Sequence, residues 1–218
     1  MTAAALAAEG VSFCYPGAQA PIMGNWSQTF ERGTLTAMTG PSGCGKSTRL
    51  YLLALLTRPA RGRVLIDGRR VDHLPDPDRA RVRARRFGFV FQDAALDPTR
   101  SVLDNVVESA LYRHEDPRRY LRRAQELLGT VGVEVPLRRR PGQLSGGQAQ
   151  RIALCRALLT SPEIVFADEP TGNLDPASAD VVLSALRSHA AAGGCVVLVT
   201  HDAEVAARAD VHVRFEER

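Results

Sequence analysis

Residues Gly40–Ser47, which read GPSGCGKS, have the spacing G-x-x-x-x-G-K-[ST]. Glycines in such a loop let the backbone curl until successive N–H groups point at one anion. An apolar run at Thr34–Thr39 precedes the loop and a helix-like segment at Lys46–Thr57 follows it. The loop should therefore lie at a helix N-terminus, which favours negative charge. The motif predicts a loop that binds phosphate groups.

Lys46 is the only lysine of the chain, because 27 of the 28 basic residues are arginine. A lysine in this loop can reach the β- and γ-phosphates of a nucleotide, and the hydroxyl of Ser47 can bind Mg²⁺. The other residues of the predicted nucleotide-binding loop are Gly40, Pro41, Ser42, Gly43, Cys44, Gly45 and Thr48.

Two adjacent carboxylates follow another apolar run. Residues Ile164–Pro170 read IVFADEP, so Asp168 ends a predicted strand and Glu169 lies on the turn after it. The first carboxylate can hold the shell of a Mg²⁺ ion, and the second can polarise an attacking water molecule. Such a pair is weak evidence by itself. Beside a phosphate-binding loop, it predicts hydrolysis of a nucleoside triphosphate.

A third motif, LSGGQ, occupies Leu144–Gln148 and precedes a further helix-like segment. Ser145 is suited to cap the helix, and Gly146 and Gly147 would leave bare N–H groups at its start. With Gln148, they fit a second phosphate-binding element. Standing alone, the same residues would form a plain turn and helix cap.

Apolar runs alternate with helix-like segments along most of the chain. Continuous apolar character predicts strands that are buried on both faces, at Thr34–Thr39, Phe87–Phe91, Ile164–Ala167 and Cys195–Thr200. Helices are predicted at Lys46–Thr57, Tyr120–Thr130, Gln148–Thr160 and Ala177–Ala192. This alternation indicates an α/β fold with a mainly parallel sheet, whose ligands bind at the carboxyl ends of the strands. Five candidate residues fall at those ends: Gly40, Gln92, Asp168, Glu169 and His201.

Two parts of the chain depart from the alternation. The first 33 residues and Arg63–Asp67 contain short runs and turn residues, which predict a small antiparallel sheet. From about Leu96 to Arg140 the chain is polar and helix-like, so we expect a helical insertion that continues to about residue 160. We expect residues 1–218 to form one domain.

The composition excludes several classes of protein. The longest apolar helix-like stretch, Leu50–Leu56, is too short to span a bilayer, which takes about 20 residues. The N-terminus lacks the charged leading region of a signal peptide, so we expect the protein to stay in the cytoplasm. The four cysteines contain no C-x-x-C pair, which indicates free thiols.

The net charge is +4, and the positive excess lies at Arg79–Arg86 and Arg138–Arg140. No aromatic residues are interleaved with these arginines. We therefore expect a solvated face, or a surface near anionic lipid headgroups, rather than a nucleic-acid site.

Taken in order, the motifs resemble those of ATP-binding-cassette ATPases, the nucleotide-binding subunits of ABC transporters, from Val11 to about Asp210. The matching elements are GPSGCGKST at Gly40–Thr48, Gln92 after FGFVF, LSGGQ at Leu144–Gln148, ADEP at Ala167–Pro170, NLD at Asn173–Asp175 and His201 after LVT. The segment PTGNLD most resembles lipoprotein-releasing, macrolide-export and cell-division cassettes. The resemblance implies a P-loop NTPase (RecA-like) core, an N-terminal antiparallel β subdomain and an inserted α-helical subdomain.

The resemblance implies ATP and Mg²⁺ as ligands and assigns further roles. Gln92 would sense Mg²⁺ and the γ-phosphate and would face the transmembrane partner. His201 would contact the γ-phosphate. The implied catalytic residues are Glu169, His201, Gln92 and Lys46, and the implied metal-site residues are Ser47, Gln92 and Asp168.

Two more residues match the family pattern, and two depart from it. Tyr15 matches the aromatic residue that stacks on adenine, although it also fits plain strand packing. Asp175 would lie at the interface between two cassettes. Arg49 stands where the family usually has an apolar residue, and Ala149 replaces a more usual polar one.

The resemblance also implies an assembly. ATP would lie between two cassettes of a homodimer, with the phosphate loop from one copy and Ser145, Gly146 and Gly147 from the other. The ATPase, soluble when isolated, would power a separate membrane permease from the cytoplasmic face, for export or other extracytoplasmic work. One alternative is an ATPase that drives a membrane signalling or mechanotransmission complex without transport. Another is a soluble ABC ATPase that acts on DNA or ribosomes, whose usual coiled-coil insertion or tandem cassettes the sequence does not show.

Overall fold

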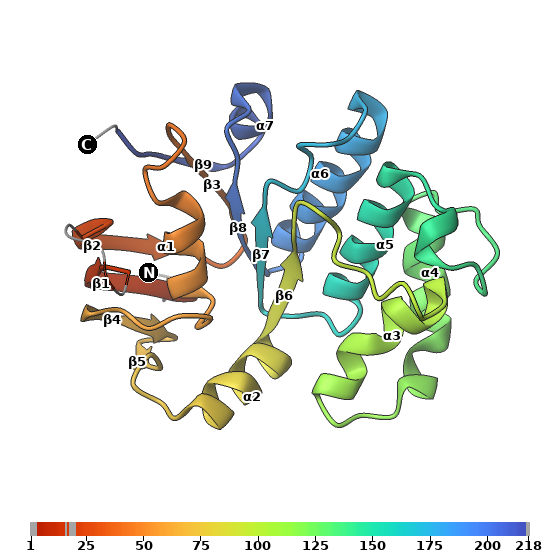
Figure 1. The fold of residues 1–218 in the computed structure, drawn as a ribbon, viewed down its shortest axis with the longest axis horizontal. Coiled ribbons are helices and arrows are strands. Elements are labelled where there is room, and N and C mark those ends of the chain that lie inside the picture. Colours follow the sequence, from red (N-terminus) through yellow and green to blue (C-terminus); the bar gives the residue numbers. More distant parts are fainter. Residues whose placement is uncertain (1–3, 16, 18–20, 217–218) are drawn as a thin grey trace.

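A computed structural model describes residues 4–15, 17 and 21–216 of the protein. Five strands form a sheet in which every neighbouring pair is parallel (Figure 1). Their order is β6 (Phe87–Val90), β7 (Ile164–Asp168), β8 (Cys195–Val199), β3 (Leu35–Thr39) and β9 (Val211–Arg214). A second, antiparallel sheet has the order β2 (Met23–Phe30), β1 (Leu6–Phe13), β4 (Arg61–Ile66) and β5 (Arg69–Arg70). The predicted parallel sheet with an antiparallel neighbour is confirmed.

The helices connect and cover these strands. They are α1 (Lys46–Leu53), α2 (Asp76–Arg86), α3 (Val102–Tyr112), α4 (Leu121–Thr130), α5 (Gly146–Leu158), α6 (Pro176–Ala191) and α7 (Ala203–Ala207), with 3₁₀ turns at Pro117–Tyr120 and Pro141–Gln143. Between β6 and β7 the chain forms α3, α4 and α5 without a strand, so the predicted helical insertion is confirmed. No helix within the described ranges combines the length and the apolar character that crossing a membrane requires.

The parallel sheet is buried on both faces because its central strands are apolar at successive positions. On one face, Phe166 and Val197 pack with α1 and the antiparallel sheet. On the other face, Val165 and Leu198 pack with α3, α5 and α6. Helices α1 and α5 therefore lie against opposite faces of the sheet (Figure 1).

Helix α2 lies where the sequence suggested only a charged surface at Arg79–Arg86. Arg79 is buried, and both Arg79 and Arg83 donate to the carbonyl of Leu55, at 3.3 and 2.8 Å. Leu55 has a left-handed φ of 58°, which a helix cannot continue through, so α1 ends at Leu53 and not at the predicted Thr57. These two arginines therefore fasten α2 to the core. The fifth parallel strand, β9, was not predicted because its residues are largely exposed and form no apolar run.

Four charged residues join the elements at the amino ends of β6 and β7. Arg32 contacts Asp67 and Glu163, each at 2.9 Å, and Arg86 pairs with the same two carboxylates. The hydrogen bond from Arg86 lowers the pKa of Glu163. Burial raises the pKa of Asp67, but the hydrogen bonds from Arg86 and Arg32 outweigh it and leave that pKa lowered.

This network predicts a loss of stability in acid. A carboxylate with a lowered folded pKa stabilises the fold above its ordinary pKa of about 4, and that contribution disappears as the pH falls further. The urea midpoint of the native protein should therefore drop more steeply between about pH 5 and pH 3 than that of a Glu163→Gln variant. Equal acid dependence of the two midpoints would show that the ion pairs of Glu163 contribute nothing.

Candidate functional site

The phosphate-binding loop connects β3 to α1 in a tightly packed turn. Gly40, Gly43 and Gly45 have φ angles of 153°, 82° and 85°. A Cβ atom at Gly40 would lie 2.6 Å from the carbonyl oxygen of Phe215, and one at Gly45 would lie 2.7 Å from Ile22 Cγ2. Larger residues would collide with these neighbours at Gly40 and Gly45, whereas Gly43 is favoured by its left-handed φ alone.

Lys46 begins α1, and its side chain folds back over the loop. Its Nζ donates to the carbonyls of Gly40 and Pro41, at 2.8 and 2.9 Å. These partners are neutral, so the ammonium charge is positioned by the loop without being neutralised by it. Such a charge at a helix N-terminus can bind phosphate oxygens.

Ser47, Asp168 and Tyr51 form the part of the site that fits a magnesium ion. The Ser47 hydroxyl donates to Asp168 Oδ1 at 3.1 Å, and the Tyr51 hydroxyl also hydrogen-bonds Asp168. Burial raises the pKa of Asp168. A hard cation beside this carboxylate would offset that cost, and oxygen ligands suit Mg²⁺.

The rest of a magnesium shell would have to come from the substrate or water. Nowhere in the described ranges do three or more His, Cys, Asp or Glu side chains come together in a way that could hold a metal ion. Mg²⁺ commonly keeps several waters and uses few protein carboxylates together with substrate phosphates. The small donor set around Asp168 fits that pattern.

Glu169 and His201 follow the adjacent strands β7 and β8. His201 Nδ1 lies 2.9 Å from Glu169 Oε1, and the side chains are 70% and 16% exposed, respectively. Glu169 has a left-handed φ of 47°, and its N–H donates to the carbonyl of Val199 at 2.9 Å. Strained backbone at a carboxylate is typical of functional sites.

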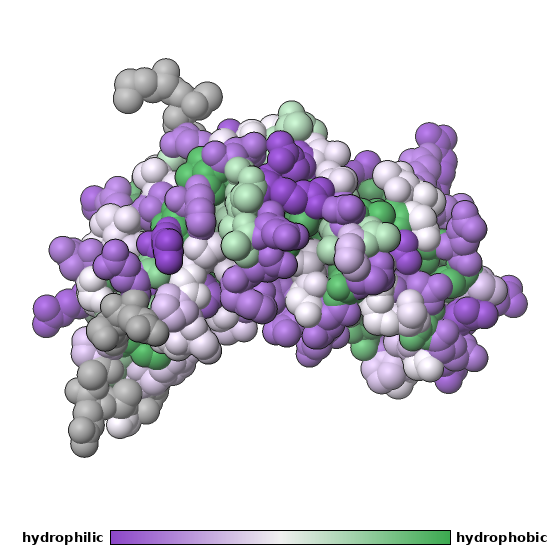
Figure 2. All heavy atoms as spheres, turned by 90° about the horizontal axis from the view of Figure 1, so that it is seen from above, coloured by the Kyte–Doolittle hydropathy of each residue, from purple (hydrophilic) through white to green (hydrophobic). Residues whose placement is uncertain are grey.

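Gln92 is exposed just after β6. A Cβ atom built on Gly172 would lie 3.6 Å from Gln92 Nε2 and 3.9 Å from Glu169 Cβ, so Gln92 lies against the turn that follows Glu169. The structure thus brings Lys46, Asp168, Glu169, Gln92 and His201 to one edge of the sheet. Figure 2 views the molecule from above this edge, where hydrophilic residues gather over the middle.

Tyr15 lies beside the phosphate loop. Its hydroxyl is 3.2 Å from Thr48 Oγ1, and its ring contacts Phe13 edge to face at 4.9 Å. The side chain remains 45% exposed. An aromatic surface at this place can stack on a base, and the contact with Phe13 fixes its orientation.

The LSGGQ motif lies apart from the phosphate loop, at the start of α5. Ser145 caps α5 by accepting a hydrogen bond from the Gln148 N–H at 3.2 Å, and Gln148 Oε1 accepts one from the Ser145 N–H at 3.0 Å. Asp175 caps α6 through the Ser178 N–H at 2.9 Å, and Gly147 lies against Ser178. Since α5 and α1 lie on opposite faces of the sheet, the structure does not join this motif to the phosphate loop of the same chain.

For two residues of α1, the sequence did not predict the contacts that the structure shows. Arg49 stacks over Phe215 and Trp26, at 4.1 and 5.5 Å from the ring centres, and donates to the Cys44 carbonyl at 2.5 Å. The arginine thus braces the phosphate loop. Tyr51 contacts Asp168, and its spacing of four residues from Ser47 could have placed it on the same helix face.

Comparisons with known proteins agree with this geometry. The family model described as ABC transporter matches residues 23–172. The lipoprotein-releasing system ATP-binding protein LolD of Bordetella avium is 43% identical over 95% of this chain and 91% of its own length. The macrolide export ATP-binding/permease protein MacB of Nitrosomonas europaea is 45% identical over 81% of this chain and 27% of its own length.

A solved structure shares the whole fold. It is a dimeric ATP-binding cassette in a post-hydrolysis state bound to ADP and Pi, with a TM-score of 0.89 and 32% identity. The match covers 98% of this chain and 97% of that one. Together with the site geometry, these matches show that the chain belongs to the ABC transporter family, as one of its ATP-binding and ATP-hydrolysing cassettes.

Proposed function

We propose that the residues gathered at the carboxyl edge of the parallel sheet carry out ATP hydrolysis. Lys46 and the loop main chain bind the β- and γ-phosphates. Glu169 accepts a proton from the attacking water, and His201 contacts the γ-phosphate. The observation that carries this proposal is the convergence of these side chains and Gln92, from four separate parts of the chain, on one edge of the sheet.

The remaining site residues hold the ligands in place. Ser47, Asp168 and Gln92 would hold Mg²⁺, which neutralises phosphate charge when it is bound. Tyr15 offers its exposed ring to the adenine. Pro41, Ser42, Gly43 and Cys44 shape the loop, and Thr48 orients Tyr15 through its hydroxyl.

A second copy of the chain would complete the site. Ser145, Gly146 and Gly147 lie at the start of α5, against the sheet face opposite to α1, so they would reach an ATP molecule bound to another copy. Asp175 would lie at the interface between the copies. The solved relative bound to ADP and Pi is a dimer, which supports this arrangement.

The partner proposed for this dimer is a membrane permease. Residues of α2, β6 and α3 line a groove of about 950 Å³, and the apolar side chains in it include Leu56, Phe91, Leu96 and Tyr112. Tyr112 is 61% exposed and Leu56 is 45% exposed, so both are open to a docked segment. The groove would receive a cytoplasmic segment of the permease, and the ATPase would then lie at the cytoplasmic face of the membrane.

The names of the relatives favour lipoprotein release or export over mechanotransmission without transport. We propose that the chain acts as a single ATPase domain, with residues 96–160 as its helical insertion, and that it powers work of this kind.

Co-purification from membranes tests the proposed partner. The native protein should bring down a permease with few membrane helices and a large external domain. Leu56→Glu should lose this permease, because the new charge lies in the groove. Leu121→Glu is the matched control and should retain it, since Leu121 is 38% exposed on α4 and does not line the groove. Retention of the permease by both variants would refute docking in this groove. Absence of any membrane protein from the native sample would refute a permease as the partner.

A further inference from the structure

The backbone that follows Gln92 has a conformation that its own residues do not favour. Ala94 and Ala95 have φ angles of 57° and 47°. Two successive non-glycine residues in the left-handed region are strained, and such backbone persists only where its surroundings hold it. Contacts from outside this segment must therefore fix it.

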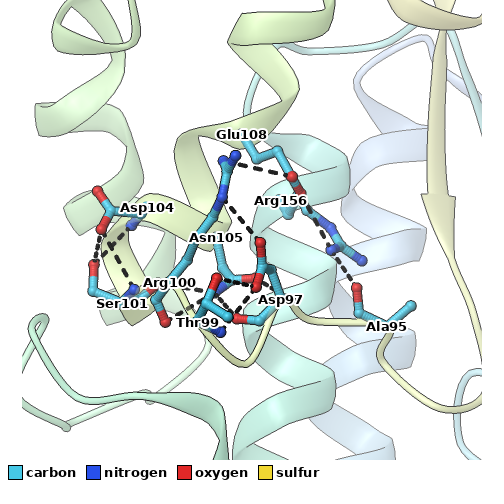
Figure 3. A network of polar contacts seen from close by, with 9 residues as sticks. All are labelled: Ala95, Asp97, Thr99, Arg100, Ser101, Asp104, Asn105, Glu108 and Arg156. Carbon is cyan, nitrogen blue, oxygen red and sulfur yellow. Dashed lines mark hydrogen bonds and ion pairs between the residues drawn. The ribbon is translucent and has the colours of Figure 1, made fainter.

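Arg156 of α5 supplies two of these contacts. Its Nη1 donates to the Ala95 carbonyl at 2.7 Å (Figure 3). Its Nη2 donates to the Ala94 carbonyl at 2.8 Å. The side chain is 13% exposed, and Glu108 of α3 lies 3.7 Å from Nη1. A planar fork that binds two successive carbonyls orients both peptide groups at once.

Two buried amide side chains hold the same segment on either side of these alanines. Gln150 of α5 is 3% exposed and donates to the Phe91 carbonyl at 2.8 Å. Asn105 of α3 is fully buried, donates to the Asp97 carbonyl at 3.1 Å and accepts from the Asp97 N–H at 2.8 Å (Figure 3). From Phe91 to Asp97, the main chain is thus bound by side chains of the inserted helices.

We propose that Gln150 and Arg156 are positioning residues that clamp this segment to α5 and thereby set the place of Gln92 in the nucleotide site. The inference rests on the role proposed above for Gln92. Helix α5 also begins beside Ser145, so one rigid helix connects Gln92 with the motif offered to the second copy.

Amide hydrogen exchange on the isolated protein tests the clamp directly. Arg156→Ala should speed exchange at residues 92–97 by about tenfold or more, because both carbonyls lose their partner. Arg156→Lys keeps the charge but has no fork, so it should give a smaller increase and remain informative if the alanine variant is unstable. Arg123→Ala is the matched control. Arg123 donates to the carbonyl of Leu159, which follows α5, at 2.7 Å and does not contact residues 92–97. Its loss should leave the exchange rate of residues 92–97 unchanged.

An unchanged exchange rate in both Arg156 variants, or an equal rise in Arg123→Ala, would overturn the clamp. Turnover gives an independent reading. Arg156→Ala should lower kcat by about tenfold while the dissociation constant of ATP changes by less than about twofold, because the phosphate loop is left in place.

Gln92→Ala, measured beside these variants, separates the clamp from the proposed function. If Gln92→Ala is impaired and Arg156→Ala turns over normally, the positioning role of Arg156 is wrong. If Gln92→Ala itself keeps the native kcat, the role proposed for Gln92 fails, and the exchange rates still decide whether the clamp exists.

Discussion

Glu169→Gln should bind ATP normally and hydrolyse it at least about 100-fold more slowly than the native protein. Glutamine keeps the shape of the side chain and can still hydrogen-bond His201, which lies 2.9 Å from Glu169 Oε1. It cannot accept a proton from the attacking water at neutral pH. Because hydrolysis would separate the two copies, the variant should accumulate as an ATP-bound dimer.

Nucleotide binding, steady-state turnover and size-exclusion chromatography with ATP would check this expectation. Glu126→Gln is the matched control, since Glu126 is exposed on α4, and it should turn over like the native protein. A Glu169→Gln variant with native steady-state turnover would remove Glu169 from the chemistry. A variant that is slow because it no longer binds ATP would contradict the role of a proton acceptor.

Lys46→Arg should lose about 100-fold or more of the turnover although it keeps the positive charge. The ammonium of Lys46 fits between the carbonyls of Gly40 and Pro41, at 2.8 and 2.9 Å. A planar guanidinium is larger and would need the loop to open. The loop cannot easily open, because Gly40 and Gly45 already lie against Phe215 and Ile22.

Equilibrium ATP binding and steady-state hydrolysis would measure the effect of Lys46→Arg. Arg61→Lys, an exchange of the same two residue types at an exposed position of β4, is the control and should change neither quantity. Unchanged affinity and turnover in Lys46→Arg would show that the single lysine of the chain is incidental.

Most of the site could be predicted because its residues directly follow apolar strands. Parallel strands end at a common edge, so Asp168, Glu169 and His201 had to lie close together once the sheet was recognised. The phosphate loop carries its own backbone signal in its glycines. Each of these inferences needed only local sequence and the geometry of a parallel sheet.

The clamp could not be predicted in this way. Arg156 and Gln150 lie about 60 residues from the carbonyls that they bind, and nothing in their own neighbourhood marks them. Two alanines give no sequence signal for left-handed backbone, because φ > 0 is normally signalled by glycine or asparagine. Strand β9 was missed for a related reason, since an exposed edge strand lacks the apolar run of a buried one.

The arginine clusters show the same limit. The charge of Arg79–Arg86 can be read from the sequence, but the partners of these arginine side chains cannot. In the folded chain, Arg79 and Arg83 bind the Leu55 carbonyl, and Arg86 joins the network with Asp67 and Glu163. Arginines that we expected to form a solvated face thus hold α2 against its neighbours.

In the dimer proposed above, one ATP site is built from two copies of the chain, with Lys46 from one and Ser145 from the other. The most direct test mixes two variants that should each be inactive, Lys46→Arg and Ser145→Arg, by co-expression. In a mixed dimer, one site carries both substitutions and the other carries neither. Turnover should therefore rise well above the sum of the separate variants, towards about one quarter of the native value. A mixture that is no more active than that sum would contradict a site shared between copies.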